Sequence, residues 1–427
     1  MKRKTGLTLE TEPSRRRSGV FAIVAAVLMA FALLTADATA ASKEYVLHAL
    51  GGEGDASFPT SALVADAAGN LYGEGGGGAH GFGAIFKLTR TSGGWKESVI
   101  YSFPGGKSGA APMGGLVWDA VGNLYGTTVA GGTPLVCHKA GCGTVFELSP
   151  SSDGEWKETV LYRFGSCKTD GCLPYGGAIF DASGSLYGTT KGGAGSGGQG
   201  TVFKLTPTSG GWTEELLYSF TNNGVGGFPA SGLVFDKTGN LYGAATAGYG
   251  TIFELTPNSG GWQGKLLYGF PGGSDGRAPN GPLIFDGAGN IYGTTQEGGP
   301  QNYGTTFELS PHDGTWSETV LYDFCSISNC QDGGEPIAGL VFDAGGDLYG
   351  TTYYGGGESY CAGRGCGAVF KLELSGGKWT ESVLHSFTAG NDGQNPMAAV
   401  IVEGGKLYGT TLYGGVHNDG VVFQVKP

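Results

Sequence analysis

The sequence predicts an all-β fold, a seven-bladed β-propeller with four antiparallel strands in each blade. Three observations lead to this prediction: one motif recurs seven times, each copy holds four short strand-like segments, and no segment shows helical periodicity or helix caps. The copies follow each other at intervals of 50 to 62 residues. Four-stranded units repeated in this way are typical of propellers.

In its clearest copies the repeat reads G-L-V-F-D-x-x-G-N-L-Y-G-T-T and continues, after a Gly-rich stretch, with G-T-V-F-E-L and W-x-E-x-V-L-Y-x-F. Segments rich in Val, Ile, Phe, Tyr and Thr, separated by Gly, Pro, Asp and Asn, indicate strands joined by tight turns. The tyrosines of the Leu/Ile-Tyr-Gly triplet mark the seven copies: Tyr72, Tyr125, Tyr187, Tyr242, Tyr292, Tyr349 and Tyr408.

The two ends of the repeat region predict how the ring closes. The seventh copy stops at residues 421–425 and lacks its fourth strand, whereas residues 44–50 align with the fourth-strand residues 318–324 of an earlier copy. We therefore expect three C-terminal strands and one N-terminal strand to form the last blade, which removes exposed sheet edges. The alternative, an open solenoid, would leave both partial copies unpaired.

Turn chemistry assigns the two faces of the propeller. The D-x-x-G-N segments, such as residues 66–70, and the Ser-Gly-Gly-Trp segments predict hairpins on one face. The longer segments between second and third strands, and the connections between blades, then lie on the opposite, upper face. A proline precedes every innermost strand, where its missing donor does no harm: Pro59, Pro112, Pro174, Pro229, Pro279, Pro336 and Pro396.

The first forty residues predict export. Residues 1–40 combine a basic stretch ending at Arg17, an apolar run over residues 20–34 and Ala38-Thr39-Ala40, which is typical of a cleaved signal peptide. Residues 41–427 then form a single propeller domain, extracellular or periplasmic. A retained anchor is the alternative, but the apolar run is shorter than the roughly 20 residues that a spanning helix needs.

Charge limits the partners of the exported chain. Cleavage would remove six basic and three acidic residues and move the formal charge from -12 to -15. Such a chain without basic clusters repels phosphate backbones and anionic lipids, so we expect no nucleic-acid partner and no membrane binding. We expect a monomer, with a polysaccharide or an extracellular protein as partner.

The repeat resembles the GloVer repeat, the Gloeobacter/Verrucomicrobia-type tandem repeat. Its core motifs L-x-x-D-x-x-G-N-L-Y-G-T-T and G-T-V-F-K-L are matched at residues 233–242, Thr189-Thr190 and residues 200–205. The resemblance implies an exported protein of unestablished biochemical role, often with a C-terminal sorting anchor. This sequence departs from that pattern by ending directly after the last strand, so we expect a released protein. The resemblance implies no catalytic residues.

All eight cysteines fall in four C-x4-C pairs in predicted upper-face loops: Cys137 with Cys142, Cys167 with Cys172, Cys325 with Cys330, and Cys361 with Cys366. An even count in an exported chain predicts disulfides, most simply one within each pair, which would mainly stiffen the loops. Two alternatives remain: cross-pairing between adjacent loops, and a four-thiolate zinc site in each set of consecutive loops. Structural zinc sites usually start from shorter C-x2-C spacings, so we expect no bound metal.

The sequence offers little catalytic chemistry. The inner strands open with small residues, for example Gly114-Gly115 and Ala398-Ala399, whereas a catalytic propeller gathers His, Asp or Glu at the mouth of its channel. The repeated aspartates form turns, and the histidines are scattered or replace an outer-strand tyrosine. Asp-Gly steps at Asp170, Asp275, Asp332 and Asp392 lack the alternating acidic ligands of a calcium loop. We expect no catalytic residues and no cofactor.

Departures from the repeat on the upper face indicate a binding site. After the Thr-Thr step the copies diverge, and two adjacent blades place tyrosines there. The expected site comprises Tyr353, Tyr354, Tyr360, Arg364, Tyr413, Glu297 and Lys191. Exposed aromatic rings suit sugar faces or peptides; the alternative is that these rings pack beneath long loops.

Two classes of function follow. The first is a non-enzymatic extracellular binding or scaffold protein, with polysaccharide or another envelope component as its ligand. The second is a propeller enzyme, a polysaccharide lyase or hydrolase, which would need two or more carboxylates or histidines at the channel mouth.

Overall fold

The computed structural model describes residue 1 and residues 44–427, except residues 134–136, 138–139, 194–197, 222–223, 230 and 358–360. The chain divides into two compact units, Met1–Ser42 and Lys43–Pro427, and the second is described below. The predicted signal peptide, residues 1–40, lies outside the described residues except for Met1. In the described part of the chain, no helix is long and apolar enough to cross a membrane.

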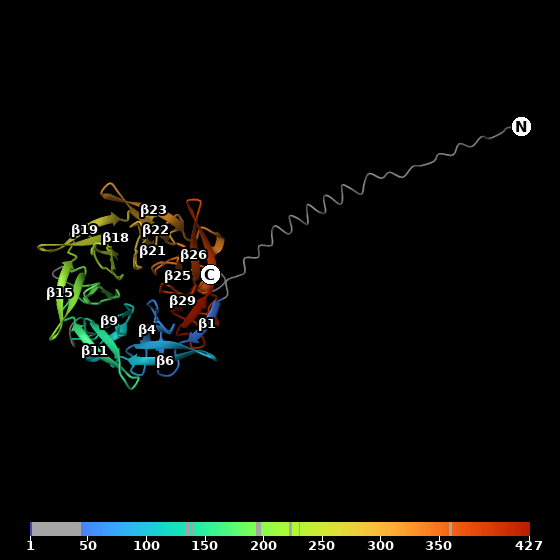
Figure 1. Ribbon diagram of the computed structural model, residues 1–427. Coiled ribbons are helices and arrows are strands. Elements are labelled where there is room, and N and C mark those ends of the chain that lie inside the picture. Colours follow the sequence, from blue (N-terminus) through green and yellow to red (C-terminus); the bar gives the residue numbers. More distant parts are fainter. Residues whose placement is uncertain are drawn as a thin grey trace. The chain divides into compact units, whose positions relative to one another are not determined.

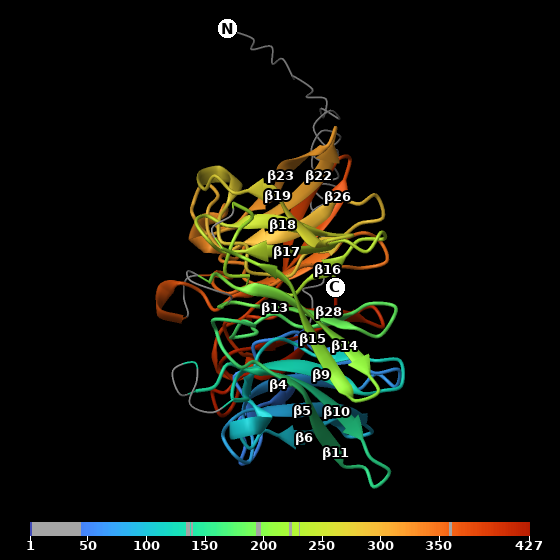
Figure 2. The same cartoon turned by 90° about the vertical axis from the view of Figure 1, so that its left-hand side faces the viewer.

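Seven antiparallel sheets are arranged in a ring, which confirms the predicted seven-bladed β-propeller (Figure 1). The α-helix is absent from the described residues, and five short 3-10 turns occur in the loops. Figure 2 shows the ring from the side, with the β10–β11 and β14–β15 hairpins projecting from one face and the loops with 3-10 turns from the other.

Each blade runs from a short inner strand to a long outer strand, and the inner strand is split in two in the first two blades. Blade 1 contains β2 (Ala56–Ser57), β3 (Val64–Ala65), β4 (Leu71–Gly77), β5 (Ala84–Thr91) and β6 (Gly94–Ser102). Blade 2 contains β7 (Ala110–Pro112), β8 (Val117–Trp118), β9 (Leu124–Ala130), β10 (Thr144–Pro150) and β11 (Trp156–Arg163). Blade 3 contains β12 (Ile179–Phe180), β13 (Leu186–Thr190), β14 (Thr201–Thr208) and β15 (Gly211–Ser219).

Blade 4 contains β16 (Val234–Phe235), β17 (Leu241–Ala245), β18 (Thr251–Asn258) and β19 (Gly261–Gly269), and blade 5 contains β20 (Ile284–Phe285), β21 (Ile291–Thr295), β22 (Thr305–His312) and β23 (Thr315–Asp323). Blade 6 contains β24 (Val341–Phe342), β25 (Leu348–Thr352), β26 (Ala368–Ser375) and β27 (Lys378–Ser386). Blade 7 contains β28 (Ile401–Glu403), β29 (Lys406–Thr411), β30 (Val421–Val425) and β1 (Glu44–Ala49). In this last sheet β1 pairs antiparallel with β30, with Glu44 opposite Val425 and Ala49 opposite Val421.

The motif residues form these strands for identifiable reasons. The L-Y-G-T-T strands are buried on both faces, whereas the W-x-E strands alternate between more and less exposed residues, as a strand with one packed face does. The glycine of L-Y-G allows close packing: a Cβ at Gly293 would lie 2.6 Å from the ring of Phe307. The turn aspartates accept hydrogen bonds, as Asp286 does from the backbone N–H of Asn290 (2.9 Å) and the hydroxyl of Tyr292 (3.2 Å).

Phenylalanine pairs join neighbouring blades. At six interfaces the phenylalanine that follows an outer strand packs edge-to-face against the third-strand phenylalanine of the next blade, as Phe324 does against Phe370 with ring centroids 5.0 Å apart. The other pairs are Phe103–Phe146, Phe164–Phe203, Phe220–Phe253, Phe270–Phe307 and Phe387–Phe423. At the seventh interface Leu50 follows β1 and is buried in one cluster with Phe86.

Carboxyl groups also lie between the blades. Each W-x-E glutamate, and the equivalent Glu44, is half-buried, and one buried oxygen of each has no hydrogen-bond partner among the described residues. Burial raises the pKa of Glu44, Glu214 and Glu318 to about 7 and that of Glu381 to about 8. These side chains therefore take up protons in the folded state well above the usual pH for a carboxylic acid.

The segment before each inner strand has a feature that the sequence did not predict. In all seven blades the residue preceding the proline has a left-handed backbone, with φ between 49° and 60°. Its N–H donates to a carbonyl of the preceding blade, as Glu335 does to Tyr303 (2.6 Å). The seven residues are Phe58, Ala111, Leu173, Phe228, Ala278, Glu335 and Asn395.

Candidate functional site

Six side chains gather on the upper face of blades 5 to 7, and we name them the tyrosine site: Gln296, Glu335, Tyr353, Tyr354, Arg364 and Tyr413. Tyr353 and Tyr354 directly follow β25, and Tyr413 follows β29 by two residues. Short backbone ladders fix these positions, because Tyr354 bridges to Gly334 and Tyr413 bridges to Gln394. The chain segments that carry the prolines therefore hold the tyrosines in place.

The aromatic part of the site is a connected group of half-buried rings. Tyr353 and Tyr354 meet edge-to-face with centroids 4.7 Å apart, and the Arg364 guanidinium lies 5.3 Å from the centre of the Tyr354 ring. Tyr413 packs edge-to-face on Phe58, whose side chain is 40% exposed, at 5.7 Å. Burial raises the pKa of Tyr353, and the nearby Tyr354, Tyr413 and Glu335 raise it further.

The polar part of the site is a chain of hydrogen bonds across two blades. The Asn280 amide donates to Gln296 Oε1 (2.7 Å), and the Gln296 amide donates to Glu335 Oε2 (3.2 Å). On the other side, the Asn395 amide donates to the Tyr353 carbonyl (2.8 Å). Within the described ranges, the hydroxyls of Tyr353, Tyr354 and Tyr413 make no hydrogen bond, in contrast to the repeat tyrosines that bond to turn aspartates.

The structure brings together four of the seven residues expected to bind: Tyr353, Tyr354, Arg364 and Tyr413. Of the other three, Glu297 forms an ion pair with Arg277 (2.5 Å), and Lys191 in blade 3 lies 5.2 Å from the centre of the Tyr175 ring. Tyr360 lies outside the described residues.

Sequence reasoning missed the polar partners of the tyrosines. Glu335 is an acidic residue directly before a proline, where the other copies have Phe, Ala, Leu or Asn. That difference from the other copies could have drawn attention to Glu335. Only the backbone hydrogen bonds between the segment before the proline and the residues that follow β25 show that Glu335 lies opposite Tyr353.

The central channel is a second candidate. Its cavity of about 300 Å³ is lined by the small residues that open the inner strands, including Ser61, Gly114, Gly176 and Ala398. Glu74 is completely buried and lies behind this lining, next to the lining residue Gly115. Its Oε1 accepts a hydrogen bond from the Gly115 N–H (2.6 Å), and its Oε2 has no partner among the described residues.

The sequence analysis missed Glu74. Burial raises its pKa to about 7, against the opposing effect of the Gly115 N–H. Other blades place a small residue here, and Thr127, for example, donates to a carbonyl of the next blade. The departure from L-Y-G-T-T to L-Y-G-E-G in the first copy was the signal that could have identified it.

The other residues that the sequence singled out, the cysteines and the aspartates of the Asp-Gly steps, hold loops in place. Each cysteine bonds to its partner within the C-x4-C pair, which confirms the predicted disulfides. Asp170, Asp275, Asp332 and Asp392 accept hydrogen bonds from nearby loop or outer-strand groups, as Asp170 does from Tyr162 (2.9 Å). His48 takes the same place as Tyr162 and lies 3.1 Å from Asp55.

Two groups of side chains in the described part of the chain have the spacing of metal ligands. One consists of Cys137, Cys142 and Cys167, and the other of His48, Asp55 and Glu97. The second group repeats the Tyr-Asp-Glu arrangement that lies between other blades, so blade packing explains it.

Two solved structures that are similar to this chain share its fold. A fungal alcohol oxidase of the AA5 family, in complex with copper, superposes with a TM-score of 0.58 at 16% identity, over 90% of this chain and 76% of that one. A candidate 6-phosphogluconolactonase from Bacteroides fragilis superposes with a TM-score of 0.51 at 12% identity, over 85% of this chain and 98% of that one. At these identities the likeness extends to the fold alone.

The sequence comparisons are more specific. No curated protein matches the sequence. The model of the Gloeobacter/Verrucomicrobia repeat matches residues 137–363 and 245–427, which together span most of the chain. The chain therefore belongs to the Gloeobacter/Verrucomicrobia repeat family.

Proposed function

We propose that this protein is an exported binding protein whose tyrosine site holds an uncharged polysaccharide without cleaving it. The observation that carries the proposal is the connected group of three tyrosines, whose hydroxyls bond to none of the described residues, beside Glu335 and Gln296. Aromatic rings bind the apolar faces of sugars, and a few convergent polar groups fix the orientation of the ligand.

The polar groups match sugar hydroxyls. Glu335 is an acceptor, Gln296 offers an acceptor and donors, and Arg364 is a donor. Each sugar hydroxyl can donate a hydrogen bond to Glu335 and accept one from Gln296 or Arg364. The formal charge of -12 disfavours anionic polymers, so a neutral glycan fits the site better than a uronic-acid polymer.

Export is part of the proposal. Four disulfides indicate an oxidising environment, such as that outside the cytoplasm. The apolar run before Ala40 is typical of a signal peptide that directs export. We expect the mature chain to begin after Ala40 and to act as a monomer, in the periplasm or outside the cell.

One observation favours the alternative, an enzyme acting on polysaccharide. Glu74 is a buried carboxyl group behind the channel lining, and one of its oxygens has no partner among the described residues. Burial raises its pKa to about 7, which suits a general acid. A second catalytic group would have to reach the same sugar, and the channel residues near Glu74 are Ser61, Gly114 and Gly115. Binding therefore remains the better supported function.

The experiment measures binding and cleavage together. The protein is incubated with insoluble and soluble plant and microbial polysaccharides, and both retained protein and released sugars are quantified. We expect retention without release, lost in Tyr353→Ala and Tyr354→Ala and kept in the control Tyr249→Ala, which removes a more exposed tyrosine from a blade 4 loop. Release of sugars that stops in Glu74→Gln would establish the enzyme instead, and retention unaffected by the Tyr353 and Tyr354 variants would refute the site.

A further inference from the structure

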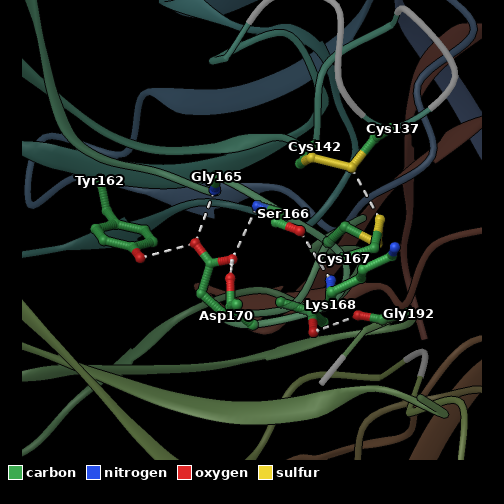
Figure 3. Close-up of a disulfide and its surroundings, with 12 residues drawn as sticks. Cys137, Cys142, Tyr162, Gly165, Ser166, Cys167, Lys168, Asp170 and Gly192 are labelled. Atoms are coloured by element: carbon green, nitrogen blue, oxygen red, sulfur yellow. Dashed lines mark hydrogen bonds between the residues drawn. A yellow bond between two sulfur atoms is a disulfide. The ribbon is translucent and has the colours of Figure 1, made fainter. Parts of the chain in front are cut away.

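The cysteines of the first two pairs form one cluster. The Sγ atoms of Cys137 and Cys167, which belong to different disulfides, lie 2.8 Å apart (Figure 3). The Sγ atoms of Cys137, Cys142 and Cys167 all lie within 4.8 Å of one another. All four cysteines, including Cys172, pack in the same apolar cluster, and Cys142 and Cys172 are buried.

The fold holds this cluster together by contacts other than the disulfides. The Leu173 N–H donates to the Cys142 carbonyl (3.0 Å), which fixes the two loops next to each other. Within the second loop, Asp170 accepts from the Gly165 N–H (2.7 Å) and the Ser166 N–H (2.9 Å) (Figure 3). The loops are therefore positioned by hydrogen bonds that persist if the disulfides are reduced.

The second set of cysteines differs, although its sequence pattern is the same. Among the described residues, no sulfurs from Cys325–Cys330 join those from Cys361–Cys366 in a group with metal-ligand spacing. Cys361 and Cys366 pack together in a different apolar cluster, and the Cys361 sulfur contacts Gln394 Oε1 (3.2 Å). The chain thus contains a built-in control with equal spacing and a different arrangement.

We propose that Cys137, Cys142, Cys167 and Cys172, once their two disulfides are reduced, form a site for one Zn²⁺ or another thiophilic divalent cation. Tetrahedral zinc binds thiolate sulfur at about 2.3 Å, which places the sulfurs about 3.8 Å apart. The sulfurs of Cys137, Cys142 and Cys167 already lie within 4.8 Å of one another, and the fourth sulfur, that of Cys172, is bonded to Cys167, so the cluster is close to this geometry.

The chemistry balances with a phosphine as reductant. For each disulfide, one phosphine and one water give two thiols and one phosphine oxide. Four thiols then bind one divalent cation as thiolates and release four protons, so binding strengthens as pH rises. Oxidation to the two disulfides removes the ligands, and the cluster therefore has either two disulfides or one metal ion.

The test uses the full chain, reduced with a phosphine until mass spectrometry after alkylation shows eight free thiols. Co²⁺ is titrated in, because its tetrathiolate complexes have characteristic absorption bands, and Zn²⁺ is then added to displace it. We expect one equivalent of Co²⁺ per chain with tetrathiolate bands, bleached by Zn²⁺. The bands should be lost in Cys137→Ser/Cys142→Ser and in Cys167→Ser/Cys172→Ser.

The quadruple variant Cys325→Ser/Cys330→Ser/Cys361→Ser/Cys366→Ser is the matched control and should keep the full signal. The proposal is overturned if reduced wild-type chain shows no tetrathiolate bands, or if two equivalents bind. It is also overturned if the two sets of variants lose the signal equally, since an unfolded chain would bind metal through both sets alike. Near-ultraviolet circular dichroism of the reduced chain records whether the propeller persists.

Discussion

Replacing Leu50 with alanine should destabilise the propeller by about 3 kcal/mol. Leu50 follows β1 and is fully buried against blade 1, in one cluster with Leu63, Leu71 and Phe86. It occupies the place that a phenylalanine takes at the six other blade interfaces. The substitution therefore tests whether the N-terminal strand holds the last blade against the first.

The magnitude follows from burial. Leu→Ala removes three carbons, which at about 0.8 kcal/mol for each buried carbon gives about 2.4 kcal/mol of lost transfer free energy. The cavity left in a closely packed interface adds to this loss, and buried Leu→Ala changes cost about 2–5 kcal/mol in total.

Equilibrium unfolding in guanidinium chloride, followed by tryptophan fluorescence, measures the change, because Trp95 packs against the same cluster. Val46→Thr is the control: Val46 lies in the same strand but is 39% exposed, so its replacement should change the free energy of unfolding by less than about 0.5 kcal/mol. If Leu50→Ala changes stability no more than Val46→Thr does, the pairing of β1 with β30 does not support the ring in solution.

Three other perturbations have defined outcomes. Gly293→Ala should cost about 1–3 kcal/mol, because the new Cβ meets the Phe307 ring, whereas Gly287→Ala, in open space of the same blade, should be neutral in the same unfolding assay. Asp236→Ala should cost about 1–3 kcal/mol, because it leaves the N–H groups of Thr238 and Asn240 without their acceptor and removes one of the two acceptors of the Tyr242 hydroxyl; Asp236→Asn should recover part of this loss. Burial raises the folded pKa to about 7 to 8 at four inter-blade glutamates, Glu44, Glu214, Glu318 and Glu381, above the ordinary value near 4.5, so their stabilising effect is complete below pH 4.5 and lost as pH rises through 7 to 8. Calorimetry should therefore give a lower Tm at pH 8 than at pH 5, with a smaller difference in Glu381→Gln, and a Tm that rises over this range would contradict the assignment.

The fold could be predicted from the sequence because the same strand and turn motifs occur in seven copies. The D-x-x-G-N turns, the L-Y-G-T-T strands and the W-x-E strands each satisfy local rules of turn chemistry and alternation, and repetition removes the ambiguity of a single copy. The disulfide partners were predictable for the same local reason, since each pair closes a short loop.

Long-range relations were harder to predict. Glu335 and Tyr353 are 18 residues apart, and only the backbone ladder shows that they are neighbours. The two sets of cysteines have the same local spacing, but in the described part of the chain the packing of the loops brings sulfurs of different pairs together in the first set and not in the second. Glu74 lies in the second strand of its blade rather than in an inner strand, and only the fold shows that its carboxylate accepts a hydrogen bond from the channel-lining Gly115.

The most direct test of the proposed function is amide hydrogen exchange, with and without the polysaccharide that the protein retains. The proposal predicts slower exchange upon binding in the segments around Glu335, Tyr353, Tyr354 and Tyr413, with no change in the hairpins of the opposite face. Protection of those hairpins instead, or around Gly115 at the channel without protection of the tyrosine segments, would contradict it.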